Sequence, residues 1–265
     1  MTQYDGASSG TAEPAVANSY YHALQMKYEK RFSKGLTFLG HYTWSKMLDD
    51  ASIGSGNYSW LGGSTAQQNP LNRRGEKSLS AHDIAHRVVL SGAYQLPFGR
   101  GRAIAGGSSR LLDAFIGGWE LSAFGIFQGG NPLQIGQNGG VMQNGGSQRP
   151  NLIGDPSVEG PIVDRINGGY FNRAAFSQPA PDVFGSAPRY LNYRGPGIKT
   201  VDAALLKSIQ VKEGQRFEFR LEATNFTNTP IFSDPNTAFG NSNFGTITGT
   251  KVGSRNVQLG FKYYF

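Results

Sequence analysis

The sequence predicts an all-β protein, an antiparallel up-and-down transmembrane β-barrel segment of about seven strands that forms an incomplete barrel. The chain has 265 residues, among them 37 Gly, 12 Tyr and 17 Phe, and only 16% of its residues are charged. Gly serves turns and irregular loops, whereas Tyr and Phe favour strands. Apolar and polar residues alternate with a period of two in seven segments, which indicates strands with one apolar face. Short and long connections follow one another between these segments, as they do in outer-membrane barrels.

Composition excludes several classes of protein. The chain has no Cys, which excludes a disulfide framework, a Cys-ligated zinc and thiol catalysis. No apolar stretch approaches the ~18 residues of a transmembrane helix. Residues 1–18 lack the basic start and apolar core of a secretory signal. The net charge is +7, but the basic residues are scattered and form no known recognition motif, so we expect no nucleic acid as a partner.

The clearest strand is the segment 217–224. Its apolar side carries Phe219 and Leu221, and its other side carries charged residues. The same alternation predicts six further strands, near residues 23–29, 37–45, 87–96, 119–128, 200–205 and 257–265. We expect strands of roughly 9–13 residues, close to the ~9–11 that cross a bilayer at a tilt.

The connections between the predicted strands alternate in length. In chain order they are a short turn at 31–35, a long loop at 47–83, a moderate segment at 98–118, the longest loop at 129–199, a tight turn at 212–215 and a long loop at 225–255. We expect a short helix at 110–115 in the moderate segment and an extra hairpin arm near 244–250 in the last loop. Short turns on one side and long loops on the other are typical of outer-membrane barrels.

A soluble β-sandwich is the alternative fold, because it too needs strands with one buried face. Two features favour the barrel. Aromatic residues gather at the predicted strand ends, where the girdles of a membrane barrel lie. The polar sides of the strands also carry many charges, which suit a water-filled lumen; we expect three of them to face the lumen or a plug, namely Glu218, Arg220 and Glu222.

The C-terminal sequence VQLGFKYYF resembles the terminal signature of bacterial outer-membrane barrels, which end in Phe after alternating apolar residues. In that class the last strand is read by the barrel-assembly machinery. The resemblance therefore implies an assembly signal made by Leu259, Phe261, Tyr263 and Phe265.

Internal segments resemble the barrel of the Oar-like TonB-dependent receptors, in the same order and over most of the chain from about Ala17 onward. Examples are NSYYHALQMKYEKRFSKGLTFLGHYTWSKMLDD, AHDIAHRVVLSGAYQLPFGRGR, GGWELSAFGIFQGGNPL and RFEFRLEATNFTNTPIF. Such receptors also have carboxypeptidase-regulatory-like and plug domains, to which nothing here corresponds. The resemblance implies that residues 1–18 are the remnant of an extracellular loop and that 19–265 are the C-terminal portion of the barrel.

The resemblance also implies a function, which is to form part of the wall and surface loops for energy-dependent uptake of an unidentified solute across the bacterial outer membrane. The expected partners are membrane lipid, the plug, the remaining barrel strands and the assembly machinery, with TonB acting only through the N-terminal part missing here. An adhesin or structural surface barrel without active transport is the alternative. The loop residues Tyr58 and Trp60, with the Gly/Asn/Gln-rich stretch 129–146, are candidates for contacting a carbohydrate or peptide.

No residue pattern indicates an enzyme, a cofactor or a metal site. His82 and His86 have the i, i+4 spacing of a helical zinc pair, but Asp83 stands where the zinc-protease motif needs Glu. We therefore expect the two His to mark a polar strand end. Asp49 and Asp50 offer two carboxylates to a cation, but a solvated loop start is the simpler interpretation.

Overall fold

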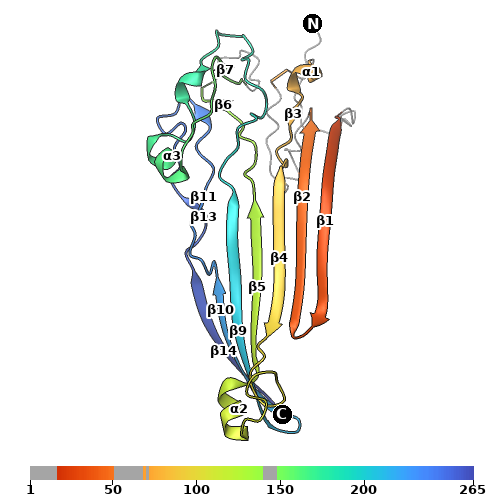
Figure 1. The fold of residues 1–265 in the computed structure, drawn as a ribbon. Coiled ribbons are helices and arrows are strands. Elements are labelled where there is room, and N and C mark those ends of the chain that lie inside the picture. Colours follow the sequence, from red (N-terminus) through yellow and green to blue (C-terminus); the bar gives the residue numbers. More distant parts are fainter. Residues whose placement is uncertain (1–16, 51–67, 70–71, 140–147) are drawn as a thin grey trace, which may run out of the picture.

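The computed structural model describes residues 17–50, 68–69, 72–139 and 148–265. Its main element is one antiparallel sheet in which each long strand pairs with the next along the chain (Figure 1). These strands are β1 (Ser19–Ser33), β2 (Leu36–Asp49), β4 (His86–Gln95), β5 (Trp119–Gln128), β9 (Ile198–Lys212), β10 (Gln215–Thr224) and β14 (Asn256–Tyr264). The short β3 (Ser78–Leu79) adds to one end of β2. The predicted up-and-down order of seven strands is confirmed.

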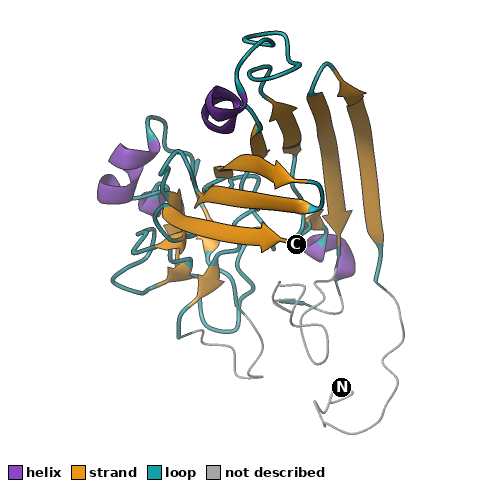
Figure 2. Ribbon diagram, turned by 90° about the horizontal axis from the view of Figure 1, so that it is seen from below, coloured by secondary structure: helices purple, strands orange, loops and turns teal. Residues whose placement is uncertain are grey.

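The sheet is open. Within the described ranges, β1 pairs only with β2 and β14 pairs only with β10 on the main sheet path. Seen from the end that carries the turns, the later strands run in a different direction from β1 and β2, so the sheet is strongly twisted (Figure 2). The incomplete barrel predicted from the sequence is confirmed.

One end of the sheet carries the short connections. The β1–β2 turn is made by Lys34 and Gly35, both at positive φ (52° and 82°). The β4–β5 connection contains the predicted helix, α2 (Arg110–Ile116), whose first turn is capped by the Ser109 hydroxyl accepting from the Leu112 N–H at 3.2 Å. After α2, Gly118 has φ +66°, and a Cβ there would lie 2.1 Å from the Ser208 carbonyl oxygen. Only glycine fits this close approach.

The opposite end carries the long connections and the remaining elements (Figure 1). The helices there are α1 (Arg73–Glu76), α3 (Ile162–Gly168) and the 3-10 helix η2 (Arg173–Ala175), and the short strand pairs are β6 (Gly136–Gln137) with β12 (Ala238–Phe239), β7 (Asn151–Leu152) with β8 (Phe176–Ser177), and β11 (Ile231–Phe232) with β13 (Thr250–Val252). The hairpin arm expected near 244–250 therefore lies elsewhere. The buried side chain of Phe244 packs in a hydrophobic cluster, and only Thr250 of that segment is in a strand.

The register of the strands gives the sheet one apolar face. Directly opposite residues on paired strands share a face, and Leu221 lies opposite Leu205 on one side and Leu259 on the other. This apolar face carries Tyr20, Leu24, Met26 and Tyr28 from β1, Leu36, Phe38, Tyr42 and Trp44 from β2, Val88, Leu90 and Tyr94 from β4, Trp119, Leu121 and Phe127 from β5, Val201, Leu205 and Ile209 from β9, Phe217, Phe219 and Leu221 from β10, and Val257, Leu259, Phe261 and Tyr263 from β14.

The apolar face is not the core of the protein. Leu259 is 84% exposed and Phe261 57% exposed, and no second sheet packs over these strands in the described part of the chain. The sandwich alternative is therefore wrong, because a sandwich buries this face. The buried hydrophobic cluster lies instead among the long connections, around Phe171 and Phe244. In the ranges that the structure describes, no helix is both long and apolar enough to span a membrane.

Candidate functional site

The polar face of the sheet carries the charged residues that the sequence singled out. Glu218, Arg220 and Glu222 lie on the face of β10 opposite to Phe219 and Leu221. The Arg220 Nε lies 3.1 Å from Glu222 Oε1, and both side chains are partly exposed. These three residues therefore lie on the side of the sheet away from the apolar residues, as expected. That this side faces a lumen or a plug stays a prediction.

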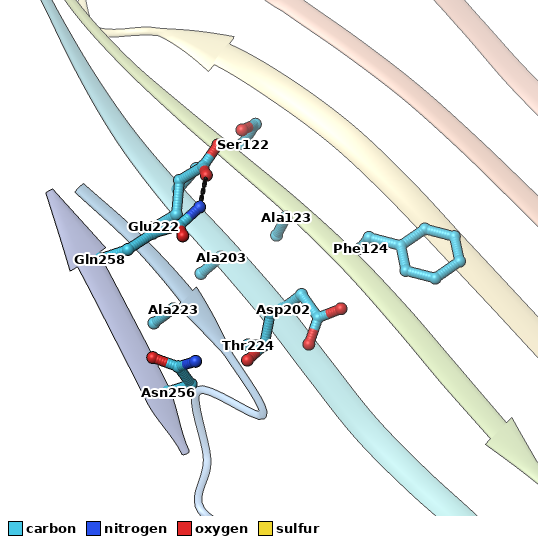
Figure 3. Close-up of a pocket in the computed structure, with 11 residues that line it drawn as sticks. Ser122, Ala123, Phe124, Asp202, Ala203, Glu222, Ala223, Thr224, Asn256 and Gln258 are labelled. Carbon is cyan, nitrogen blue, oxygen red and sulfur yellow. Dashed lines mark hydrogen bonds between the residues drawn. The ribbon is translucent and has the colours of Figure 1, made fainter. Parts of the chain in front are cut away.

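A hollow of about 370 Å³ lies on the polar face next to Glu222 (Figure 3). The small side chains of Ser122 on β5 and Ala204 on β9 lie directly opposite each other. The surface is therefore lower there than at the longer side chains around it. Asp202 and Glu222 point toward it with two amide side chains, Asn256 and Gln258. We call this feature the wall hollow.

The polar groups of the wall hollow are held by hydrogen bonds. The Gln258 amide Nε2 donates to Glu222 Oε2 at 2.5 Å (Figure 3). The Asp202 carboxylate accepts from the backbone N–H of Asn225 at 2.8 Å, which fixes the turn at the end of β10. Two carboxylates with neighbouring amides present mainly acceptors. Since Arg220 already pairs with Glu222, this arrangement suits a neutral group rich in hydroxyls.

The long connections pack together into a cap, by which we mean the described residues of 68–85, 129–197 and 225–255. Its hydrophobic cluster joins the β5–β9 connection to the β10–β14 connection. The rings of Phe171 and Phe244 lie edge to face with centroids 4.8 Å apart, and Phe176 packs against both. Leu133 and Ile135, from the glycine-rich stretch named above, lie in the same cluster. The described part of that stretch, 129–139, therefore partly forms core, and 140–146 lies outside the described residues.

A tyrosine at the edge of the cluster is held by its hydroxyl. The Tyr170 hydroxyl donates to the Arg194 carbonyl oxygen at 2.9 Å, and the Tyr193 hydroxyl donates to the Tyr170 carbonyl at 2.8 Å. Burial raises the pKa of the Tyr170 hydroxyl to about 12. The phenol is therefore neutral at physiological pH and acts as a hydrogen-bond donor.

Buried ion pairs also join the parts of the cap. Arg149 contacts Glu76 with both guanidinium Nη atoms, at 2.6 Å and 3.2 Å, and both side chains are almost fully buried. Glu76 Oε1 also accepts from the backbone N–H groups of Gln68 and Asn69. A buried charge needs this degree of pairing, because its desolvation is costly.

Two further arginines form ion pairs, one between the cap and the end of β2 and one between two parts of the cap. Arg189 is fully buried and pairs with Asp49 at the end of β2, while its Nε donates to the Glu76 carbonyl oxygen at 3.1 Å. Arg194 pairs with Asp83, which is 1% exposed. Together these contacts join the end of β2 and the helix α1 to the β5–β9 connection.

The solvated loop start expected at Asp49 and Asp50 is wrong. Both residues are buried, and Asp50 accepts from the Asn18 backbone at 2.8 Å and from Arg73 at 3.0 Å. Burial alone raises the pKa of the Asp50 carboxyl, but the hydrogen bonds from Asn18 and the Arg73 guanidinium outweigh it and hold this pKa below its usual value. The two carboxylates serve ion pairs with arginine.

The two histidines lie as expected, at a strand end. His82 is in a turn and His86 begins β4, and both are exposed. The His86 Nδ1 lies 2.9 Å from the Tyr42 hydroxyl. Over the residues that the structure places, no group of three or more His, Cys, Asp or Glu side chains is arranged to hold a metal ion.

The remaining candidates have different positions. Leu259, Phe261 and Tyr263 lie on the apolar face of β14, and Phe265 is 95% exposed. Tyr58 and Trp60 lie outside the described residues. Arg149 and Arg189 were not singled out in the sequence, because residues in irregular loops show no periodic pattern that marks them as buried.

Comparison with known proteins identifies a family. The family model of an outer membrane β-barrel domain matches residues 2–258 of the chain. Neither curated proteins nor solved structures gave a match.

Proposed function

The chain belongs to the outer membrane β-barrel family and is a protein of the bacterial outer membrane, and on that premise we propose that it forms part of the wall and surface loops of a TonB-dependent receptor. This receptor takes up an unidentified solute with energy from the inner membrane. The segments quoted above support an Oar-like type. We assign the chain no catalytic role.

The wall hollow carries this proposal. In a membrane barrel the apolar side of each strand faces lipid and the other side faces the lumen. The apolar face of this sheet is continuous across all seven long strands, so the polar face with Glu218, Arg220 and Glu222 is the lumen wall. A shallow site at that wall, with two carboxylates and two amides at its margin, supports contact with a plug or a passing solute.

The proposed partners follow from the sheet. Further strands of the same barrel pair with the edges of β1 and β14, since closure is what removes exposed strand edges in barrels. A plug contacts the polar face, and TonB acts through a part of the receptor outside this chain. The assembly machinery reads the last strand through Leu259, Phe261, Tyr263 and Phe265.

The test compares uptake and surface binding in living cells. Cells with and without this protein, each with and without TonB, are given panels of labelled oligosaccharides and oligopeptides. We expect uptake of at least one compound that needs both this protein and TonB. Asp202→Asn with Glu222→Gln lowers that uptake without changing the amount of protein in the membrane, and Glu29→Gln, on the polar face of β1, leaves it unchanged. Uptake that is indifferent to TonB contradicts the proposal.

Surface display without transport is the second candidate, and the packed cap favours it. Loops that share a hydrophobic cluster and buried ion pairs offer a preformed surface to another cell or molecule. For this function the same experiment gives binding at the cell surface with no TonB-dependent uptake.

A further inference from the structure

The helix in the β4–β5 connection has an apolar side that the rest of the chain leaves uncovered. Leu111 is 80% exposed and Phe115 is 76% exposed, and Leu112 beside them is 49% exposed. Leu111 and Phe115 are four positions apart, so they lie on the same side of α2. Large apolar residues gathered on one short helix indicate an interaction surface.

α2 is attached to the apolar face of the sheet, the face that meets lipid. The Trp119 indole Nε1 donates to the Phe115 carbonyl oxygen at 3.0 Å. The Lys207 ammonium donates to the carbonyl of Gly117, which follows the helix, and lies 5.2 Å from the centre of the Trp119 ring. Positive charge is favoured at the C-terminal end of a helix.

Lys207 is otherwise out of place on this face. It lies between Trp119 on β5 and Phe219 on β10, among apolar neighbours, and its side chain is buried. A lysine facing hydrocarbon is costly unless its charge reaches polar partners. The Gly117 carbonyl and the Trp119 ring supply those partners. The contact therefore holds α2 against the membrane side of the wall.

A groove of about 590 Å³ separates α2 from the strands. Its lining comes from Phe115 of α2, from Trp119 and Lys207, and from the strand residues Leu205, Phe219, Leu259 and Phe261. The strand residues belong to the apolar face, so the groove is continuous with the lipid-facing surface of the barrel. The cations near the start of α2 lie on its other side, since Arg100, Arg102 and Arg110 line a recess with Gln95 and Glu120 of the polar face.

We propose that α2 is an interfacial anchor that enters the phospholipid leaflet at the turn end of the barrel. Leu111, Leu112 and Phe115 lie among the upper acyl carbons, and an acyl chain occupies the groove. Lys207 is a positioning residue that fixes α2 in this place. This inference rests on the barrel alone and is independent of transport.

The test uses fluorescent labels at single cysteines, because this chain has none of its own. Leu111→Cys, Phe115→Cys and, as the control in the same connection, Arg102→Cys are labelled with an environment-sensitive dye. Each protein is reconstituted into vesicles of phosphatidylethanolamine and phosphatidylglycerol, some of it brominated on the acyl chains. Bromolipid quenching reports contact with hydrocarbon, and iodide quenching reports contact with water.

We expect bromolipid quenching at positions 111 and 115 to exceed that at 102 by about twofold or more, with iodide quenching in the reverse order. Lys207→Met lowers bromolipid quenching at 115, and Lys207→Arg retains it. Equal quenching at all three positions overturns the anchor and leaves the helix exposed to water or covered by another protein. Unchanged quenching in Lys207→Met overturns the positioning role.

Discussion

Arg189 and Asp49 form a buried ion pair although they are 140 positions apart in the sequence. Asp49 ends β2, and Arg189 belongs to the connection that leads into β9. The same guanidinium also donates to the carbonyl oxygen of Glu76, the last residue of α1. The pair thus joins the wall to the cap, and it fixes two long connections relative to each other.

Replacing Arg189 by Ala should loosen the cap. The change leaves Asp49 buried without its cation and removes the donor to Glu76. Breaking a buried pair from one side costs about 3–5 kcal/mol. Limited proteolysis of the protein in vesicles, followed by mapping of the cleavage sites, measures this as faster cutting in 129–197 while the strands stay protected.

The matched control for this experiment is Arg31→Ala. Arg31 pairs with Glu29, but its side chain is 91% exposed. Exposed pairs contribute about 0–1 kcal/mol, so cleavage of the cap should not change. Equal cleavage in both variants would show that the Arg189 pair does not hold the cap.

Replacing Phe171 by Ala should open the cap without unfolding the wall. Phe171 is 2% exposed and its ring contacts Phe176 and Phe244. Such a core truncation costs about 3–5 kcal/mol. Hydrogen exchange should rise in both long connections and stay slow in β9 and β10. Phe184→Ala, in the same connection but 40% exposed, should cost no more than about 1 kcal/mol.

The stability of the cap should depend on pH through Asp50. The pKa of this carboxyl is lower in the folded protein than its ordinary value of 3.8. Its stabilising contribution is therefore complete above that ordinary value and is lost as the pH falls through the lower folded pKa.

Protease resistance of the wild type and Asp50→Asn, measured over a series of pH values, tests this. The wild type should be more resistant near neutral pH, and the difference should shrink in acid below the ordinary value. A difference that is the same at every pH would mean that the charge on Asp50 does not contribute.

Arginine on the two faces of β10 should have different effects on membrane insertion. Phe219→Arg and Leu221→Arg place a charge on the apolar face, at about 2–4 kcal/mol near the bilayer midplane. Glu222→Arg places it on the polar face and should be tolerated. The yield of heat-modifiable protein in the outer membrane measures insertion, and equal losses in all three variants would contradict the assignment of the faces.

The strands and their faces could be predicted from the sequence because the signal is local. In β10 the alternation of Phe219 and Leu221 with Glu218 and Glu222 gives both the strand and its orientation. Residues two apart in a strand share a face whatever the strand pairs with. The short helix α2 was predicted for a similar reason, since its signal lies within one turn.

The cap could not be predicted in this way. The sequence around Asp49 and Asp50 predicts a solvated loop start, because no local pattern indicates that Arg189 and Arg73 pair with these two carboxylates. Likewise, the sequence predicts a hairpin arm around Phe244. In the structure this side chain packs against Phe171 in the hydrophobic cluster. The role of Tyr58 and Trp60 stays a prediction.

The sequence by itself determined that this protein has a run of strands, each with one apolar and one polar face, since period-two alternation is a property of each strand alone. Only the tertiary structure decided that the loops form a packed cap, that small side chains on two strands leave a hollow beside Glu222, and that Lys207 bonds to the carbonyl that follows α2. Each of these depends on contacts between residues distant in the chain. Burial and charge pairing at such contacts are set by the fold as a whole.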